Sequence, residues 1–190
     1  PVKYITKKIF GFVDVPLLSN PNLPTLLKET CVEYFDYDKC MNATPSELEQ
    51  FVIIVQDTFT SVYDAQVVAD LVRLMSKMGK RPVLLPLKPN GKALHIRGYL
   101  RSFAKTAATT SQFLTNVAKL GIPMVGVDPA IVLSYRDEYK KLLGEARGNF
   151  NVMLIQEWLL NNLDSITPKS ESEYDQYYLL AHCTQKSLKP

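Results

Sequence analysis

The fold is decided by residues 126–139, which read GVDPAIVLSYRDEY, and by the LGIPMV at 120–125 that leads into them. Met124 to Val127 is a short apolar run after a proline, which is typical of a buried strand. Asp128 can cap the exposed amides of a following helix, and Pro129 suits the first turn of that helix. The stretch therefore predicts a strand that runs directly into a helix, and α/β proteins usually bind their ligands at such crevices.

The composition is that of an ordinary globular protein. The chain has 190 residues, of which 46% are hydrophobic and 22% charged, so it can bury a substantial core. Its net charge is only +3 and no basic run alternates with aromatic residues, which argues against a nucleic-acid partner. No apolar run approaches the ~18 residues that span a bilayer, so no transmembrane segment is expected. Three cysteines, Cys31, Cys40 and Cys183, are too few for a disulfide framework and favour a reducing compartment.

Apolar patterns along the rest of the chain predict further strands and helices. Phe51 to Val55 is a continuous β-branched run typical of a central parallel strand, and Pro82 to Leu87 is a second strand. A further helix is predicted over 151–163 and a fourth strand over 177–181. The pattern as a whole predicts an open α/β fold, with a mainly parallel sheet and flanking helices in Rossmann-like βαβ units. The helical stripes are Val67, Leu71, Leu74, Met75 and Met78, then Phe103, Ala107, Thr110, Leu114 and Val117, then Val132, Tyr135, Tyr139, Leu142 and Leu143.

Four loops are expected to meet at one edge of the sheet, because parallel strands all end at that edge. The loops are 56–63, 88–98, 127–130 and 182–186. They should bring a set of polar side chains toward one crevice. These side chains are Asp57, Thr58, Thr60, Ser61 and Asp128, with Lys92, His95, Arg97 and Cys183 beside them.

The loop at 88–98, KPNGKALHIRG, is the most basic of the four. Lys92, His95 and Arg97 could contact an anion or the acidic surface of a partner domain. The alternative is a solvated basic turn. Against it, His95 and Arg97 alternate with the apolar Leu94 and Ile96 and need not point outward.

Cys183 follows the predicted fourth strand and is a weak candidate for a metal ligand. An iron–sulfur cluster usually takes about four cysteines, so one thiolate cannot hold it. Taken alone, such a cysteine is more often a small buried hydrophobic residue. The sequence contains no Ser-His-Asp order, P-loop or Gly-x-Gly-x-x-Gly, so nucleophilic and nucleotide-binding interpretations lack support.

The Arg-Asp-Glu-Tyr ending at 136–139 resembles the strand–helix step of the cysteine-rich "CCG" domain. That domain occurs in the cysteine-rich subunit of heterodisulfide reductase, in the third subunit of anaerobic glycerol-3-phosphate dehydrogenase and at the C-terminus of large bacterial FAD-linked 2-hydroxyacid dehydrogenases. Each family repeat has one cysteine after its first strand, a Cys-Cys-Gly after its second and a Cys-x-x-Cys at its third. Two such repeats hold iron–sulfur clusters.

This chain departs from the family pattern at every cysteine of the first repeat. QDTFTS at 56–61 stands at the first cysteine position, KPNGK at 88–92 replaces the Cys-Cys-Gly, and Asp128 and Ile131 occupy the Cys-x-x-Cys positions. Cys183 alone matches a family ligand, at the opening of a second repeat. The resemblance covers about residues 46–190 and implies a degenerate first repeat at 46–150, and a helix and strand at 151–190 that open a second, truncated repeat. Residues 1–45 are rich in proline and show no sustained period, which predicts an irregular lead-in segment. Aromatic residues should pack this segment onto the domain, namely Phe10, Phe12, Tyr34 and Phe35.

The resemblance also implies a function for a longer parent protein. We expect an excised piece of an oxidoreductase that uses FAD and 4Fe-4S clusters and acts on a D-2-hydroxy acid, similar to D-lactate, glycolate and D-2-hydroxyglutarate dehydrogenases. The piece itself would hold no cofactor and would serve electron exit or docking. Its partners would be the other domains of the parent and an electron acceptor, in the cytoplasm or at the inner face of the membrane. Two alternatives stay open, an anion- or metabolite-binding module and a purely structural half-domain.

Overall fold

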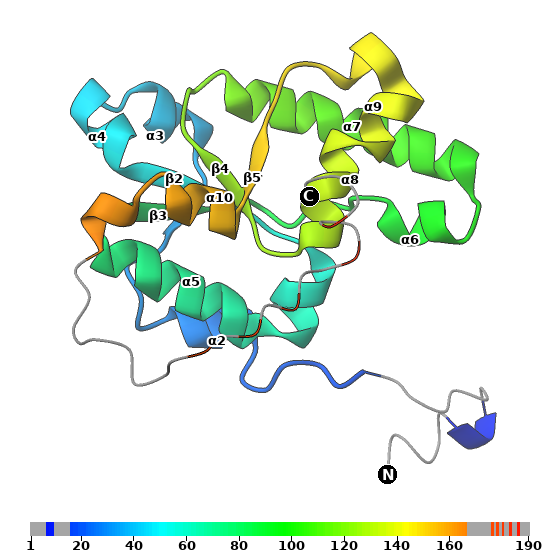
Figure 1. The fold of residues 1–190 in the computed structure, drawn as a ribbon, viewed down its shortest axis with the longest axis horizontal. Helices are drawn as coiled ribbons and strands as arrows, with labels where there is room; N and C mark the ends of the chain where they lie inside the picture. The colour runs from blue at the N-terminus through cyan, green and yellow to red at the C-terminus, as the bar shows by residue number, and fades with distance from the viewer. Residues whose placement is uncertain are drawn as a thin grey trace.

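A five-stranded parallel sheet forms the centre of the chain in a computed structural model, which describes residues 7–9, 16–166, 176, 178, 180, 183 and 186 (Figure 1). Every neighbouring pair of strands is parallel, and their order across the sheet is β1-β3-β2-β4-β5. Helices cover both faces of the sheet, which confirms the predicted open α/β fold. The strands are β1 (Glu33–Tyr34), β2 (Phe51–Val55), β3 (Arg81–Leu84), β4 (Met124–Gly126) and β5 (Val152–Leu154).

The strand order contains a switch point between β2 and β4, where successive connections run in opposite directions across the sheet. From β2 the chain crosses to β3 on one side and later returns to β4 on the other. In doubly wound α/β folds, a ligand crevice opens outside the carboxyl ends of the strands at such a switch point. The register pairs Val55 with Gly126, so β2 and β4 end at the same level beside this point.

Two hydrophobic cores pack against the two faces of the sheet. Successive side chains of a strand point to opposite faces, and in β2 Ile53 belongs to one core and Ile54 to the other, both fully buried. Burial of one such side chain contributes about 1.5–3 kcal/mol. One core lies under the helices α7 (Leu100–Ala118), α8 (Pro129–Arg136) and α9 (Glu138–Leu143). The other lies under α2 (Leu23–Leu27), α5 (Ala65–Lys77) and α10 (Ile155–Leu160).

The predicted helical stripes match most of the buried positions. All five predicted residues of α7 are buried, which confirms that helix and its inward face. In α5, Leu71 and Met75 are buried, but Val67 is 39% exposed and Val68 takes its place in the core. The stripe predicted over 132–143 falls on two helices, α8 and α9, which meet at Asp137.

The lead-in at 1–45 was expected to be irregular, and its described part instead holds short regular elements. They are α2, β1 and α3 (Tyr37–Met41), and α4 (Pro45–Gln50) follows at once. The strand β1 exists because it pairs with β3, and Arg81 donates to the carboxylate of Glu33 at 2.5 Å across that pair. Of the aromatic residues expected to anchor this segment, Phe35 packs on the core, Tyr34 is exposed, and Phe10 and Phe12 lie outside the described residues.

Four other local expectations need correction. The helix predicted over 151–163 begins as the strand β5, because residues 152–154 pair with β4, and only then becomes α10. Of the fourth strand predicted over 177–181, Tyr178 and Leu180 are described, and neither is in a strand. The remaining residues of that prediction lie outside the described part. The loops 56–63 and 88–98 contain a π-helix, η1 (Phe59–Tyr63), and the short helix α6 (Lys92–Ile96).

Among the described residues, no helix is both long enough and apolar enough to cross a membrane.

Candidate functional site at the carboxyl edge of the sheet

Two aspartates flank the switch point, one after each of the two strands that border it. Asp57 lies two residues beyond Val55, and Asp128 lies two residues beyond Gly126. Since Val55 and Gly126 are register partners, the two carboxylates occupy equivalent positions on neighbouring strands. The charge of Asp128 contributes to a raised pKa at Asp57, which is consistent with their proximity. That the two aspartates belong to one functional crevice stays a prediction.

Asp57 is almost completely buried, with 2% of its surface exposed. Its carboxylate accepts hydrogen bonds from the backbone N–H of Thr60 at 2.9 Å and from the hydroxyl of Thr60 at 2.5 Å. Burial raises the pKa of the Asp57 carboxyl, and the hydrogen bonds from Thr60 oppose part of that shift. Asp57 thus fixes the turn that enters η1.

Asp128 caps α8, as the sequence predicted. Its Oδ1 accepts from the backbone N–H of Ala130 at 2.7 Å and of Ile131 at 3.3 Å, and Pro129 is the first helical residue. The observed contacts of both aspartates therefore stabilise the backbone that follows their strands.

Side chains also pack closely against the end of β4, beside the switch point. A Cβ added to Gly126 would lie 2.4 Å from Cγ2 of Val132 and 3.2 Å from Cγ1 of Val152. These atoms belong to α8 and β5, so glycine allows both elements to approach the end of β4 closely. The space on this face of Gly126 is therefore occupied by side chains of α8 and β5.

A small open cavity does lie at the carboxyl edge, but beside β3 and β1. Its volume is about 230 Å³ and most of its lining is aliphatic. Ser61 lines it, and the Ser61 hydroxyl is buried without a hydrogen-bond partner in the described part of the chain. Thr58 is exposed outside this cavity. The lining residues are Leu23, Pro24, Leu27, Tyr34, Gln56, Ser61, Val62, Leu84 and Leu87.

The basic residues of α6 have an acidic neighbour that the sequence did not indicate. The ammonium group of Lys92 forms an ion pair with Glu138 of α9, and both side chains are largely buried. Nδ1 of His95 lies 3.8 Å from the same carboxylate, and its ring packs on Phe103 with centroids 4.7 Å apart. Arg97, the residue that ends α6, is exposed. The three predicted residues therefore differ in environment, and only Arg97 faces solvent fully.

The Arg-Asp-Glu-Tyr stretch at 136–139 links α8 and α9 to other parts of the chain. Arg136 donates to Glu157 of α10 at 2.9 and 2.5 Å and to the carbonyl oxygen of Val152 at 2.7 Å. Glu138 pairs with Lys92. The hydroxyl of Tyr139 donates to the carbonyl oxygen of Asn90 at 2.6 Å. In this structure the stretch is a tertiary clamp, because it holds α8 and α9 against the segments at 88–98 and 152–157.

The described cysteines do not form a metal site. Cys31 and Cys183 are exposed, while Cys40 is buried in the core, where burial raises the pKa of its thiol. No group of three or more His, Cys, Asp or Glu side chains in the described part could hold a metal ion. These residues do not fit an iron–sulfur cluster, which takes about four cysteine ligands.

Sequence reasoning missed Glu138 and Asn90 as organising residues. Glu138 lies 46 positions from Lys92, and Asn90 lies 49 positions from Tyr139. Charge patterning identifies pairs three or four residues apart on one helix, and it gives no signal for pairs this distant. The Asn-Gly step at 90–91 was visible as a turn, and its contact with Tyr139 depends on how α9 packs.

Fold and site together define a doubly wound α/β domain in which Asp57 and Asp128 follow the two strands that border the switch point. Comparison with known proteins shows which ones the chain is similar to. The chain is 49% identical over 189 residues to a D-2-hydroxyglutarate dehydrogenase of Escherichia coli, 48% identical over 185 residues to one of Pantoea ananatis, and 36% identical over 180 residues to one of Pseudomonas putida. These alignments cover 100%, 97% and 95% of this chain but only 18% of each relative. No family model and no solved structure matches the chain.

Proposed function

We propose that this chain is one region of a larger dehydrogenase that oxidises D-2-hydroxyglutarate or a closely related D-2-hydroxy acid. The observation that carries the proposal is the 49% identity to a D-2-hydroxyglutarate dehydrogenase across the full length of this chain. The chain spans 18% of that relative, so substrate oxidation is assigned to the longer protein. The resemblance to the CCG domain of FAD-linked dehydrogenases adds FAD and iron–sulfur clusters to the proposed parent, both bound by its other domains.

Within that parent we assign this region a role at the end where electrons leave, as a docking surface for an acceptor or for a neighbouring domain. The contacts of Asp57 and Asp128 support a structural role, because their oxygens accept hydrogen bonds from nearby backbone N–H groups. Arg97 is the basic residue best exposed to meet a partner. We place the parent in the cytoplasm, either free or at the inner face of the membrane.

The alternative of an anion-binding site at Lys92, His95 and Arg97 has weaker support. Glu138 pairs with Lys92 and lies 3.8 Å from His95, so an incoming anion would meet a carboxylate beside both basic groups. A purely structural half-domain has more support, from the clamp at 136–139. The two roles are distinguishable, because only a docking surface predicts an effect of exposed residues on electron transfer.

The test uses the protein in its full natural length and measures two half-reactions separately. Anaerobic mixing with D-2-hydroxyglutarate reports reduction of the protein by substrate, and re-oxidation by an acceptor dye reports electron exit. Arg97→Ala should slow the second step about threefold or more and leave the first unchanged, since removal of a rim charge mainly reduces the association rate. The matched control is Arg73→Ala on α5, which lies on the other face of the sheet.

Each part of the proposal has its own contrary result. If D-2-hydroxyglutarate and related D-2-hydroxy acids fail to reduce the unmodified protein, the dehydrogenase assignment is wrong. If Arg97→Ala leaves both half-reactions unchanged, the docking role of α6 is wrong and the structural role is favoured. Equal loss in both half-reactions would indicate a folding defect, and the Arg97→Lys variant, which keeps the charge, should then still restore electron exit if docking depends on it.

A further inference from the structure

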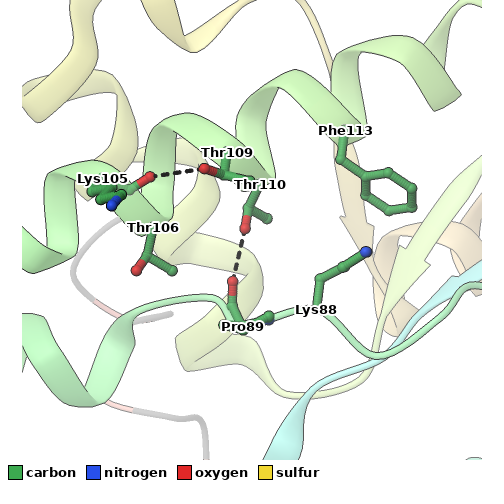
Figure 2. A pocket seen from close by; sticks show the side chains of 7 residues that line it. All are labelled: Lys88, Pro89, Lys105, Thr106, Thr109, Thr110 and Phe113. Atoms are coloured by element: carbon green, nitrogen blue, oxygen red, sulfur yellow. Dashed lines mark hydrogen bonds between the residues drawn. The ribbon is translucent and has the colours of Figure 1, made fainter.

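A second cavity lies on the outer side of α7, next to the segment that follows β3 (Figure 2). Its volume is about 280 Å³. Figure 2 places Lys88 and Phe113 toward one end of the cavity and Lys105 and Thr106 toward the other. We call it the lysine pocket. Its lining residues are Lys88, Pro89, Lys105, Thr106, Thr109, Thr110 and Phe113.

The walls of the lysine pocket are held in place by contacts to the core. The hydroxyl of Thr110, a buried residue of α7, donates to the carbonyl oxygen of Pro89 at 2.7 Å. The next residue, Asn90, is also buried, and its carbonyl oxygen accepts from Tyr139. These two bonds fix the segment 88–90 against α7 and α9. The pocket is therefore preformed, which lowers the entropy lost when a ligand binds.

The charge of the lysine pocket is positive and has no counter-charge in its lining. Lys88 and Lys105 both line it, and no acidic side chain does. Neither lysine forms an ion pair within the described residues. This differs from Lys92, only four residues after Lys88, whose charge Glu138 neutralises. Two ammonium groups at one cavity favour an anionic ligand.

The rest of the lysine pocket is mostly apolar. The ammonium group of Lys88 lies 5.4 Å from the centroid of the Phe113 ring, and that ring, Pro89 and the threonine methyl groups supply hydrophobic surface. A bare inorganic anion would leave this surface unused, and a neutral apolar molecule would leave two cations unpaired. The volume is near the lower end of the roughly 300–1,000 Å³ typical of small-molecule sites.

We infer that the lysine pocket binds a small amphipathic organic anion, a carboxylate that carries one ring or a short apolar chain. The carboxylate pairs with Lys88 or Lys105, and Thr106 offers a hydroxyl group beside it. The hydroxyl of Thr109 already donates to the carbonyl oxygen of Lys105 at 3.1 Å (Figure 2). The apolar body packs against Phe113 and Pro89. This inference is independent of the dehydrogenase proposal, because it depends only on the lining of the pocket.

The experiment titrates three probes into the full-length protein by calorimetry. The probes are 4-phenylbutyrate, its neutral amide 4-phenylbutyramide, and inorganic phosphate. The carboxylate should bind saturably with a Kd on the order of 1 mM, as expected for a ligand of this size. The amide and phosphate should each bind at least about fivefold more weakly, because each lacks one of the two interactions.

Variants tie the binding to this pocket. Lys88→Gln and Lys105→Gln should each weaken 4-phenylbutyrate about threefold to fivefold, the range of a partly exposed ion pair, while Lys105→Arg retains the affinity. Phe113→Ala should weaken it by removing the apolar wall. The control is Lys77→Gln, an exposed lysine at the end of α5 on the opposite face. Because all the substituted lysines are on the surface, the variants should melt at the temperature of the unmodified protein.

Three results would overturn the inference. They are no saturable binding of 4-phenylbutyrate at about 10-fold the expected Kd, equal binding of its amide, and binding that survives the Lys88→Gln, Lys105→Gln double variant. Phosphate that binds as tightly as the carboxylate would also overturn it, because the apolar wall would then play no part. If Phe113→Ala unfolds the protein, the lysine variants and the amide still decide the question.

Discussion

The switch point and the lysine pocket both contain charged side chains. Those at the switch point have hydrogen-bond partners within the fold, and those of the lysine pocket form no ion pair within the described residues. At the switch point, Asp57 and Asp128 accept hydrogen bonds from the residues that follow them, and Val132 and Val152 pack against Gly126 at the end of β4. In the lysine pocket, Lys88 and Lys105 line an open cavity that contains no acidic side chain. A charged residue after a parallel strand is therefore not by itself a functional residue. What matters is whether the folded chain has already supplied its partner.

The largest effect on stability should come from adding a methyl group at Gly126, beside the switch point. Gly126→Ala places a methyl group against Val132 and Val152, in a space that has no room for it. Overpacking of this kind destabilises by about 1–3 kcal/mol, and we expect about 3 kcal/mol here by urea denaturation of this chain. Val132→Ala in the same chain removes the nearest clashing methyl and should recover part of the loss. If the losses of stability from Gly126→Ala and Val132→Ala simply add in the double variant, Val132 packs less closely against Gly126 than the structure indicates.

Removing the buried carboxylate is the next largest change. Asp57→Ala leaves the N–H and hydroxyl of Thr60 without their acceptor and should lower the free energy of unfolding by about 2 kcal/mol. Thr60→Val removes only the hydroxyl donor and should lower it by about 1 kcal/mol. If instead Asp57→Ala raises stability, the carboxylate is held in place for a ligand at the expense of the fold, and the comparison with the lysine pocket fails.

The helix cap at Asp128 should contribute about half as much. Asp128→Ala removes the acceptor of the Ala130 and Ile131 amides, which for an N-cap residue costs about 1 kcal/mol. Asp128→Asn and Asp128→Ser keep an acceptor at the cap and should retain most of the stability. The urea midpoint distinguishes these cases, and a midpoint unchanged by Asp128→Ala would contradict the capping role.

A smaller effect should depend on pH. Burial raises the folded-state pKa of Asp57 above its ordinary value of 3.8, so the folded chain binds this proton more tightly than the unfolded chain. The resulting stabilisation is fully present below the ordinary pKa and is lost as pH rises through the folded-state pKa. Asp57→Asn is neutral at every pH and avoids this loss. Its stability relative to the unmodified chain should therefore improve as pH rises above 3.8, and a decline would reverse the assigned shift.

The smallest effect on stability should come from the lysine pocket itself. Lys88 and Lys105 are exposed and form no ion pair within the described residues, so Lys105→Gln should change the free energy of unfolding by less than about 0.5 kcal/mol. The same variant is expected to weaken binding of 4-phenylbutyrate. Lys105→Gln should therefore keep stability and lose binding, whereas Asp57→Ala should lose stability. Calorimetry of both variants measures this contrast directly.

The sequence determined the features that depend on neighbouring residues. The apolar run of β2, the inward face of α7 and the cap at Asp128 all follow from patterns within a few residues, and all are present. The sequence also predicts that Asp57 and Asp128 lie at one edge of the sheet, because parallel strands end at one edge.

Only the tertiary structure decided the features that depend on distant partners. The strands β1 and β5, of two and three residues, were not predicted as strands, and they pair with β3 and β4 from distant parts of the chain. The basic residues of 88–98 looked alike in sequence, yet Glu138 neutralises Lys92 while Lys88 remains beside an open cavity. The physical reason is that strand pairing and charge neutralisation both require contact in space, and for these residues that contact joins segments up to about 50 positions apart.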